Sequence, residues 1–122
     1  MPSPSQRLLA LLHDVPDAQA VTLMGHDGLP VAHAESAPTG HDLPTLWTEY
    51  AQMLVVMRRA SQEVPGPGAP GDLVIHLTQS TLLLRPLTAQ YYLALLQRAQ
   101  APAGRARLYM AQVARELHAD LF

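Results

Sequence analysis

The apolar segment from Asp42 to Val64 constrains the fold most, because its hydrophobic residues recur at helical spacing over its whole length. Asp42 can cap the first turn, since its carboxylate can accept hydrogen bonds from the free backbone amides there. The sequence Pro-Gly-Pro-Gly at 65–68 ends the helix, because proline disfavours helical backbone in the residue before it. We therefore predict one long helix. Its main apolar face comprises Leu43, Leu46, Trp47, Tyr50, Met53, Leu54, Met57, Ala60 and Val64.

This predicted helix carries more apolar surface than one buried face requires. Ala51, Val55 and Val56 lie outside the main face and widen it on both sides. A helix with so wide an apolar surface is expected to bury more than one side. We interpret one side as covering a sheet and another as meeting a second copy of the chain. The alternative is a loop that covers Val55 or Val56, since single exposed valines are common on protein surfaces.

The sequence before this segment predicts a short helix and a hairpin. Residues 1–4 are expected to form a disordered tail, and Ser5 can cap a short apolar helix. Two apolar runs, at 18–24 and 29–35, flank Gly-His-Asp-Gly, and Asp-Gly between such runs is a strong hairpin signal. Pro30 places the second strand at a sheet edge or delays its start, because proline cannot donate a hydrogen bond to a neighbouring strand.

The sequence after the long helix predicts three strands and a last helix. Apolar runs at 73–79, 81–87 and 90–97 are separated by residues that leave room only for tight turns, which is typical of an antiparallel meander. The last of these runs is compatible with a helix as well, but its two adjacent tyrosines favour a strand. A final amphipathic helix is predicted over 105–122.

The predicted order of elements is helix-β-β-helix-β-β-β-helix. This order indicates an α+β sandwich, a five-stranded antiparallel sheet with the long central helix on one face. Short connections pair the first strand with the second, and the third with the fourth and fifth. We expect the third strand to form an edge of the sheet beside the long helix.

Length and composition narrow the class of protein. A chain of 122 residues fits a single domain over 1–122. The absence of cysteine excludes thiol catalysis, disulfides and cysteine-bound metals. A formal net charge of −2 argues against nucleic acid as a partner. We identify neither a signal peptide nor an apolar run long enough to span a bilayer, so we expect no membrane insertion and a cytoplasmic location.

No local motif for catalysis is present. None of the six histidines belongs to a His-Glu-x-x-His pair, so the spacing does not indicate zinc. The chain has neither a GxxxxGK[ST] phosphate-binding loop nor a GxSxG serine motif. We therefore expect no enzyme activity, no cofactor and no metal. A site assembled from histidines distant in the sequence is the alternative.

The chain resembles the roadblock/dynein light chain family over about Arg7 to Leu117. The elements that carry the resemblance occur in a fixed order. An apolar helix, RLLALL, precedes the strand AVTLM, the turn HDG and the strand LPVAHA. The long helix follows, and after it LVIHLTQSTLLLRPL forms two strands that turn through Gln79-Ser80. The chain closes with the arginine-containing helix GRARLYMAQVAREL.

The resemblance implies a profilin-like fold and a surface that functions by binding other proteins. Family members form homodimers in which the long helices pack side by side and the third strands pair across the dimer. Many members bind small Ras-like GTPases, and some bacterial members act as activating partners of such a GTPase. Other members are scaffold subunits or dynein light chains. No catalytic motif of the family exists to transfer to this chain.

Combining the apolar pattern with this resemblance gives a predicted dimer interface. It comprises Trp47, Ala51, Leu54, Val55 and Arg58 of the long helix with Leu73, Ile75 and Leu77 of the third strand. The other apolar residues, Leu46, Tyr50, Met53, Met57 and Ala60, would then face the sheet. The alternative is that these apolar helix residues all belong to the core of a monomer.

Arg58 and Arg59 form the local charge cluster most relevant to a GTPase partner. They lie about 100° apart on the helix and point in different directions. Either could supply positive charge to a phosphoryl transfer site of the partner, and either could instead cover apolar surface with its aliphatic stem. Two hypotheses follow for the whole chain. The first is a regulatory dimer that modulates GTP hydrolysis or exchange, and the second is a scaffold or ligand-sensing subunit without effect on turnover.

Overall fold

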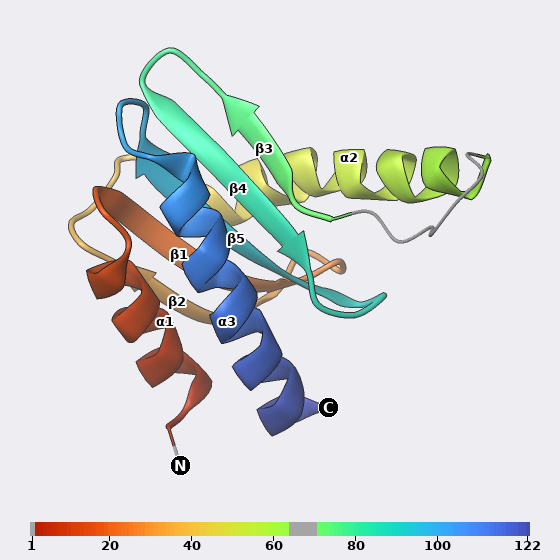
Figure 1. The fold of residues 1–122 in the computed structure, drawn as a ribbon, viewed down its shortest axis with the longest axis horizontal. Helices are drawn as coiled ribbons and strands as arrows, with labels where there is room; N and C mark the ends of the chain where they lie inside the picture. The colour runs from red at the N-terminus through yellow and green to blue at the C-terminus, as the bar shows by residue number, and fades with distance from the viewer. Residues whose placement is uncertain (1, 64–70) are drawn as a thin grey trace.

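The computed structural model describes the backbone of residues 2–63 and 71–122, and their side chains except those of 61–63. The expected helix end at Val64 and most of the Pro- and Gly-rich loop lie outside the described residues. The elements, shown in Figure 1, are α1 (Pro4–Asp14), β1 (Ala18–Gly25), β2 (Pro30–Glu35), α2 (Leu43–Glu63), β3 (Leu73–His76), β4 (Ser80–Pro86), β5 (Tyr91–Arg98) and α3 (Ala103–Leu121).

The five strands form one antiparallel sheet in the order β2-β1-β5-β4-β3. The predicted hairpin and meander are both confirmed, and β5 joins them by pairing with β4 on one side and β1 on the other. The predicted edge position of the third strand is confirmed as well. The other edge strand, β2, begins at Pro30, and an edge is where a residue without a backbone N–H is tolerated.

Helices cover both faces of the sheet, α1 and α3 on one face and α2 on the other (Figure 1). Alternate residues of each strand therefore enter different cores. Val21 and Leu23 belong to the core beneath α1 and α3, whereas Ala20 and Met24 belong to the core beneath α2. The central strands β4 and β5 are buried on both faces, which explains why they read as continuous apolar runs rather than alternating ones. The predicted α+β class is confirmed.

The N-terminal prediction is wrong in detail, because α1 begins at Pro4 and its cap is Ser3 rather than Ser5. The Ser3 hydroxyl accepts a hydrogen bond from the Gln6 backbone amide at 3.2 Å, and the Gln6 side chain accepts one from the Ser3 amide at 2.8 Å. This reciprocal pair is a capping box, and it orders residues that were expected to be a tail. Met1 lies outside the described residues.

Two other boundaries differ from the expectation by two residues or more. Strand β3 ends at His76, because the Leu77 amide donates to the Ser80 carbonyl at 2.8 Å and turns the chain early. Helix α3 begins at Ala103, where the expected start was 105. The predicted cap of the long helix is confirmed, since the Thr45 amide donates to the Asp42 carboxylate at 3.3 Å.

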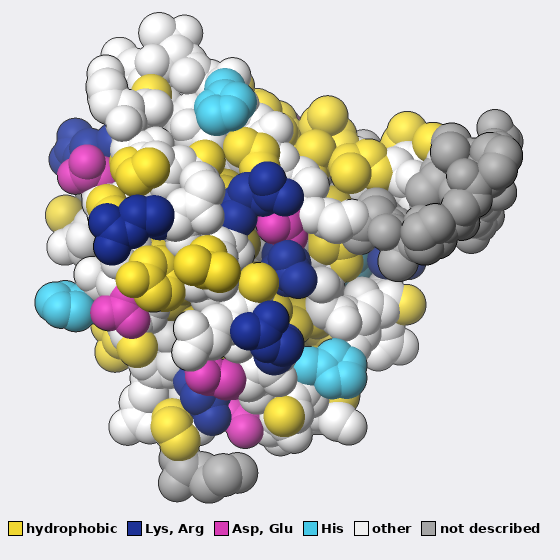
Figure 2. Space-filling view, viewed as in Figure 1, with side chains coloured by type: hydrophobic (Ala, Val, Ile, Leu, Met, Phe, Trp, Pro, Cys, Tyr) yellow, Lys and Arg dark blue, Asp and Glu magenta, His cyan; other side chains and the backbone are white. Residues whose placement is uncertain are grey.

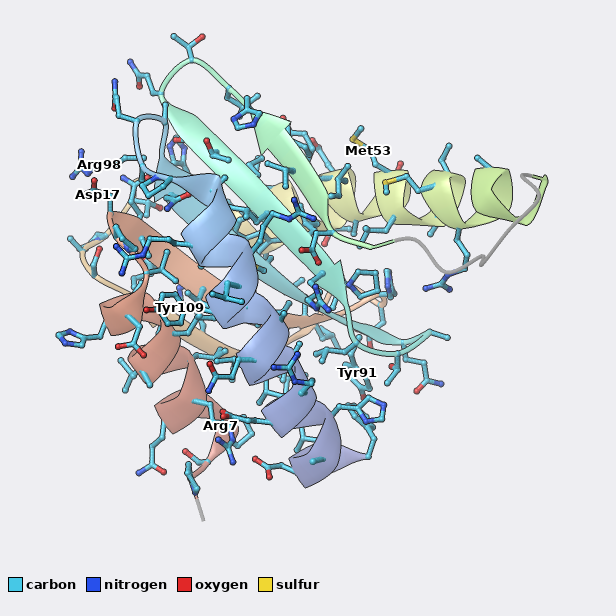
Figure 3. All side chains as sticks on the ribbon, viewed as in Figure 1. Arg7, Asp17, Met53, Tyr91, Arg98 and Tyr109 are labelled. Carbon is cyan, nitrogen blue, oxygen red and sulfur yellow. The ribbon has the colours of Figure 1, made fainter. Side chains whose placement is uncertain are left out.

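Ion pairs connect elements that are distant in the sequence. The side chain of Arg7 reaches from α1 towards α3 (Figure 3), where it donates to Asp120 at 2.6 Å and to Glu116 at 2.7 Å. Asp72, next to β3, accepts from Arg85 of β4 at 2.6 Å and from Arg107 of α3 at 3.2 Å. Asp72 thereby links the start of the edge strand to its neighbour and to the covering helix.

We expect Asp72→Asn to lower the free energy of unfolding by about 1–3 kcal/mol, because it weakens hydrogen bonds between charged groups. The Asp72 side chain is only 6% exposed, so water cannot easily replace its partners. Arg107→Gln is the matched control. Its side chain is 54% exposed, and loss of such an ion pair should cost less than about 1 kcal/mol. Urea unfolding of both variants at one protein concentration measures the difference, and equal losses would contradict the prediction.

Candidate functional site

An exposed apolar strip on α2 is the most prominent surface feature of the chain. Helix α2 crosses the sheet, and its C-terminal half projects beyond the sheet on the side of β3 (Figure 1). Hydrophobic side chains gather over this projecting part (Figure 2). We define the α2 strip as Met53, Val56, Met57 and Ala60, which follow the i, i+3, i+4, i+7 spacing of one helix face. Met53 is 45% and Val56 64% exposed, so a large part of the strip contacts solvent.

Strand β3 extends this feature. It pairs with β4 on one side, and no described strand pairs with its other side. Leu73 and Ile75 are half-buried against the core beneath α2, and the exposed Leu77 follows the strand end. An open edge strand presents unpaired backbone N–H and C=O groups that can pair with another chain. The α2 strip and the β3 edge together form the candidate protein-binding face.

The predicted division of the α2 faces is wrong in part, because Leu46 and Tyr50 pack against the core beneath α2 as expected but other residues do not follow the prediction. Trp47, Ala51 and Leu54 are buried in the core beneath α2, so they contact the sheet of their own chain. Met53 and Ala60, which were expected to face the sheet, are exposed. A helical pattern with two apolar sides does not determine which side meets the sheet. In this structure the side that carries Trp47 meets the sheet.

The remaining residues of the predicted interface have mixed positions. Val55 is exposed on the flank of α2 away from the α2 strip, and Arg58 is half-buried beside a cavity under that flank. Arg59 is exposed. The two arginines therefore point in different directions, as the spacing predicts. Whether Val55, Arg58, Leu73, Ile75 and Leu77 contact a partner stays a prediction.

A polar chain beneath α2 explains the orientation of Trp47. The Trp47 indole N–H donates to the Thr22 hydroxyl at 3.1 Å, and Thr22 Oγ1 lies 2.7 Å from His33 Nδ1. His33 Nε2 lies 2.5 Å from a Glu35 carboxylate oxygen. This series of hydrogen bonds was not predicted from the sequence. The hairpin register could have indicated one link of it, because Thr22 and His33 are directly opposite on β1 and β2.

The order carboxylate, imidazole, hydroxyl also occurs in hydrolytic triads, but here it cannot act in that way. Thr22 is buried, and its oxygen already accepts the Trp47 indole N–H. A nucleophilic hydroxyl must be accessible to a substrate carbonyl. The chain of hydrogen bonds therefore ties the edge strand β2 to α2 through β1.

Neither a metal-binding cluster nor a membrane-spanning helix is found among the described residues. Among the side chains of residues 2–60 and 71–122, no group of three or more His, Asp or Glu is arranged to hold a metal ion. None of the described helices is long and apolar enough to cross a membrane.

Comparison with known proteins places this architecture in a recognised class. No family model matches the chain, and no curated protein matches it in sequence. Solved structures do match, and the fold is that of roadblock/LC7 domains and, more broadly, of profilins. The resemblance to the roadblock family predicted from the sequence is confirmed at the level of the fold.

Three of these structures illustrate the match. A roadblock/LC7 domain from Streptomyces avermitilis is 19% identical with a TM-score of 0.81, covering 96% of each chain. A structure of MglB with a tetrameric arrangement is 22% identical with a TM-score of 0.82, covering 98% of this chain and 90% of the other. Profilin IB from Acanthamoeba castellanii is 16% identical with a TM-score of 0.66, covering 98% of this chain and 100% of the other. These identities support a common fold.

Proposed function

We propose that this chain is a non-catalytic regulatory subunit of the roadblock type, which forms a homodimer and binds a small Ras-like GTPase. In this proposal it modulates GTP hydrolysis or nucleotide exchange by the GTPase, in the cytoplasm. The observation that carries the proposal is the α2 strip beside the open edge of β3, in a fold that roadblock/LC7 domains and MglB share. A large exposed apolar area on a small domain is typical of a protein-binding surface.

A dimer with its two-fold axis beside β3 would cover both the α2 strip and the open edge of β3. Two β3 strands would pair antiparallel, and each α2 strip would lie against its copy. Two-fold interfaces are self-complementary, so a single apolar strip is sufficient for both partners. The tetrameric arrangement of MglB is a property of that protein, and it supports self-association as a use of this fold.

Arg59 is the better placed of the two arginines for contact with the GTPase. Its side chain is exposed on α2, whereas Arg58 is half-buried beside the cavity. An arginine supplied by a partner protein can stabilise the charge that develops during phosphoryl transfer. The alternative is that Arg59 remains solvated and that the dimer acts by positioning groups of the GTPase itself.

The test is to measure GTP turnover by the small Ras-like GTPases of the same organism, with and without the full chain. We expect the rate of hydrolysis or of nucleotide release to change by tenfold or more, which corresponds to about 1.4 kcal/mol in the barrier. If Arg59 enters the active site, the stimulation of hydrolysis should reach about 10³-fold or more, and Arg59→Ala should remove most of it. Arg115→Ala, an exposed arginine on α3, is the matched control.

Different outcomes separate the proposal from its alternatives. Stimulation that survives Arg58→Ala and Arg59→Ala would exclude an arginine finger and leave the positioning role. Binding without any change in turnover would contradict the regulatory proposal and favour a scaffold or ligand-sensing subunit. Such a subunit would use the same candidate face for docking.

A further inference from the structure

A small cavity lies on the flank of α2 opposite the α2 strip. It is open to solvent on one side and lined by α2, by β5 and by the turns that follow β1 and β4, and its volume is about 270 Å³. Ala51 and Val55 supply apolar walls, and polar groups come from His26, Gln52, Arg58 and Tyr92. This volume is close to the lower end of the range of roughly 300–1,000 Å³ that ligand cavities span, so the cavity suits a small molecule.

Two polar atoms at this cavity are buried without a hydrogen-bond partner among the described residues, namely the Tyr92 hydroxyl and His26 Nε2. Tyr92 is fully buried, and its ring lies 4.8 Å from the His26 ring between centroids. Buried polar groups in native proteins are normally paired, so two orphans beside one cavity require an explanation. A ligand that accepts hydrogen bonds would satisfy both groups.

The polar groups at the cavity supply two neutral hydrogen-bond donors and one positive charge. Burial raises the pKa of Tyr92 to about 12, so its hydroxyl remains a hydrogen-bond donor at neutral pH. Burial, and secondly the positive charge of Arg58, lowers the pKa of His26, so this imidazole is neutral and can donate from Nε2 in one tautomer. The described residues around this cavity include no carboxylate. Asp27 lies in an adjoining hollow, where its carboxylate accepts from the Leu29 amide at 3.0 Å.

We infer that this cavity binds a small organic carboxylate. The Tyr92 hydroxyl and His26 Nε2 donate hydrogen bonds to the carboxylate, and Arg58 contributes positive charge nearby. The short apolar body of the ligand lies against Ala51 and Val55. This inference does not depend on the proposed function, because the cavity and the α2 strip occupy opposite flanks of α2.

The test is a titration of the full chain with propionate, followed through backbone amide shifts in NMR spectra. We expect saturable shifts at Gly25, Thr48 and Ala89, which border the cavity, and no saturation with the neutral isostere propionamide. Tyr92→Phe should weaken propionate binding about tenfold or more, because it removes a hydrogen bond to a charged group. The same variant without ligand should melt no lower than the parent, because it also removes an unsatisfied buried hydroxyl.

Tyr91→Phe is the matched control, because Tyr91 packs on the opposite face of the sheet from Tyr92. It should leave propionate binding unchanged. Three outcomes would each overturn the inference. They are the absence of saturable shifts with propionate, binding of propionamide as tightly as propionate, and binding of propionate by Tyr92→Phe as tightly as by the parent chain. Tighter binding of inorganic phosphate at the same amides would overturn the assignment to an organic carboxylate.

Discussion

Glutamate at both Met53 and Val56 is expected to convert the proposed dimer into a monomer without unfolding the chain. Both side chains are exposed in the monomer, Met53 by 45% and Val56 by 64%, so charges placed there contact solvent. In a two-fold dimer the same positions meet their copies, and each dimer would have to bury four carboxylates. Burial of unpaired charge is costly, and we expect the dissociation constant of the dimer to rise at least about 100-fold. Sedimentation velocity at micromolar concentration measures this change.

The control for this prediction is Leu108→Glu on α3. Leu108 is 69% exposed, as accessible as the α2 strip, but it lies on the other side of the sheet. It should leave the mass in solution unchanged. A parent chain that sediments as a monomer would remove the dimer from the proposal. A double variant that remains dimeric would place the interface elsewhere on the surface.

Much of the fold could be predicted because its strongest signals are local. Asp27-Gly28 between two apolar runs predicts the β1–β2 hairpin, and Gly28 indeed adopts a positive φ of 89°. The runs after the long helix predict a meander because the connections are too short for any crossover. The edge position of β3 follows, since β5 pairs with β1 and thereby fills the centre of the sheet.

The faces of α2 could not be predicted in the same way. A wide apolar helix has two sides of similar hydrophobicity, and the spacing of the residues is the same for both. The choice depends on a contact distant in the sequence, the hydrogen bond from Trp47 to Thr22 of β1. The cavity has the same origin, because His26 and Tyr92 come together only when β1 pairs with β5. Sequence spacing carries no direct signal for either arrangement.

Trp47→Ala is expected to lower the free energy of unfolding by about 3–5 kcal/mol. The Trp47 ring is fully buried beneath α2, so the substitution leaves a large cavity and leaves Thr22 without the indole donor. A domain of this size is stable by roughly 5–15 kcal/mol, so the loss removes a large part of its stability. Urea unfolding followed by circular dichroism measures it, since the only tryptophan of the chain is lost. Met53→Ala, an exposed position on the same helix, should cost less than about 1 kcal/mol.

The monomeric variant with Met53→Glu and Val56→Glu allows a test of which face of α2 contacts the sheet of its own chain. If Trp47 contacts its own sheet, Trp47→Ala costs the same 3–5 kcal/mol in that background as in the parent chain. If Trp47 instead contacted a partner, as the sequence pattern suggested, the substitution would weaken the dimer and leave the stability of the monomer nearly unchanged. A loss that disappears in the monomeric background would therefore contradict the orientation of α2 on which the candidate face depends.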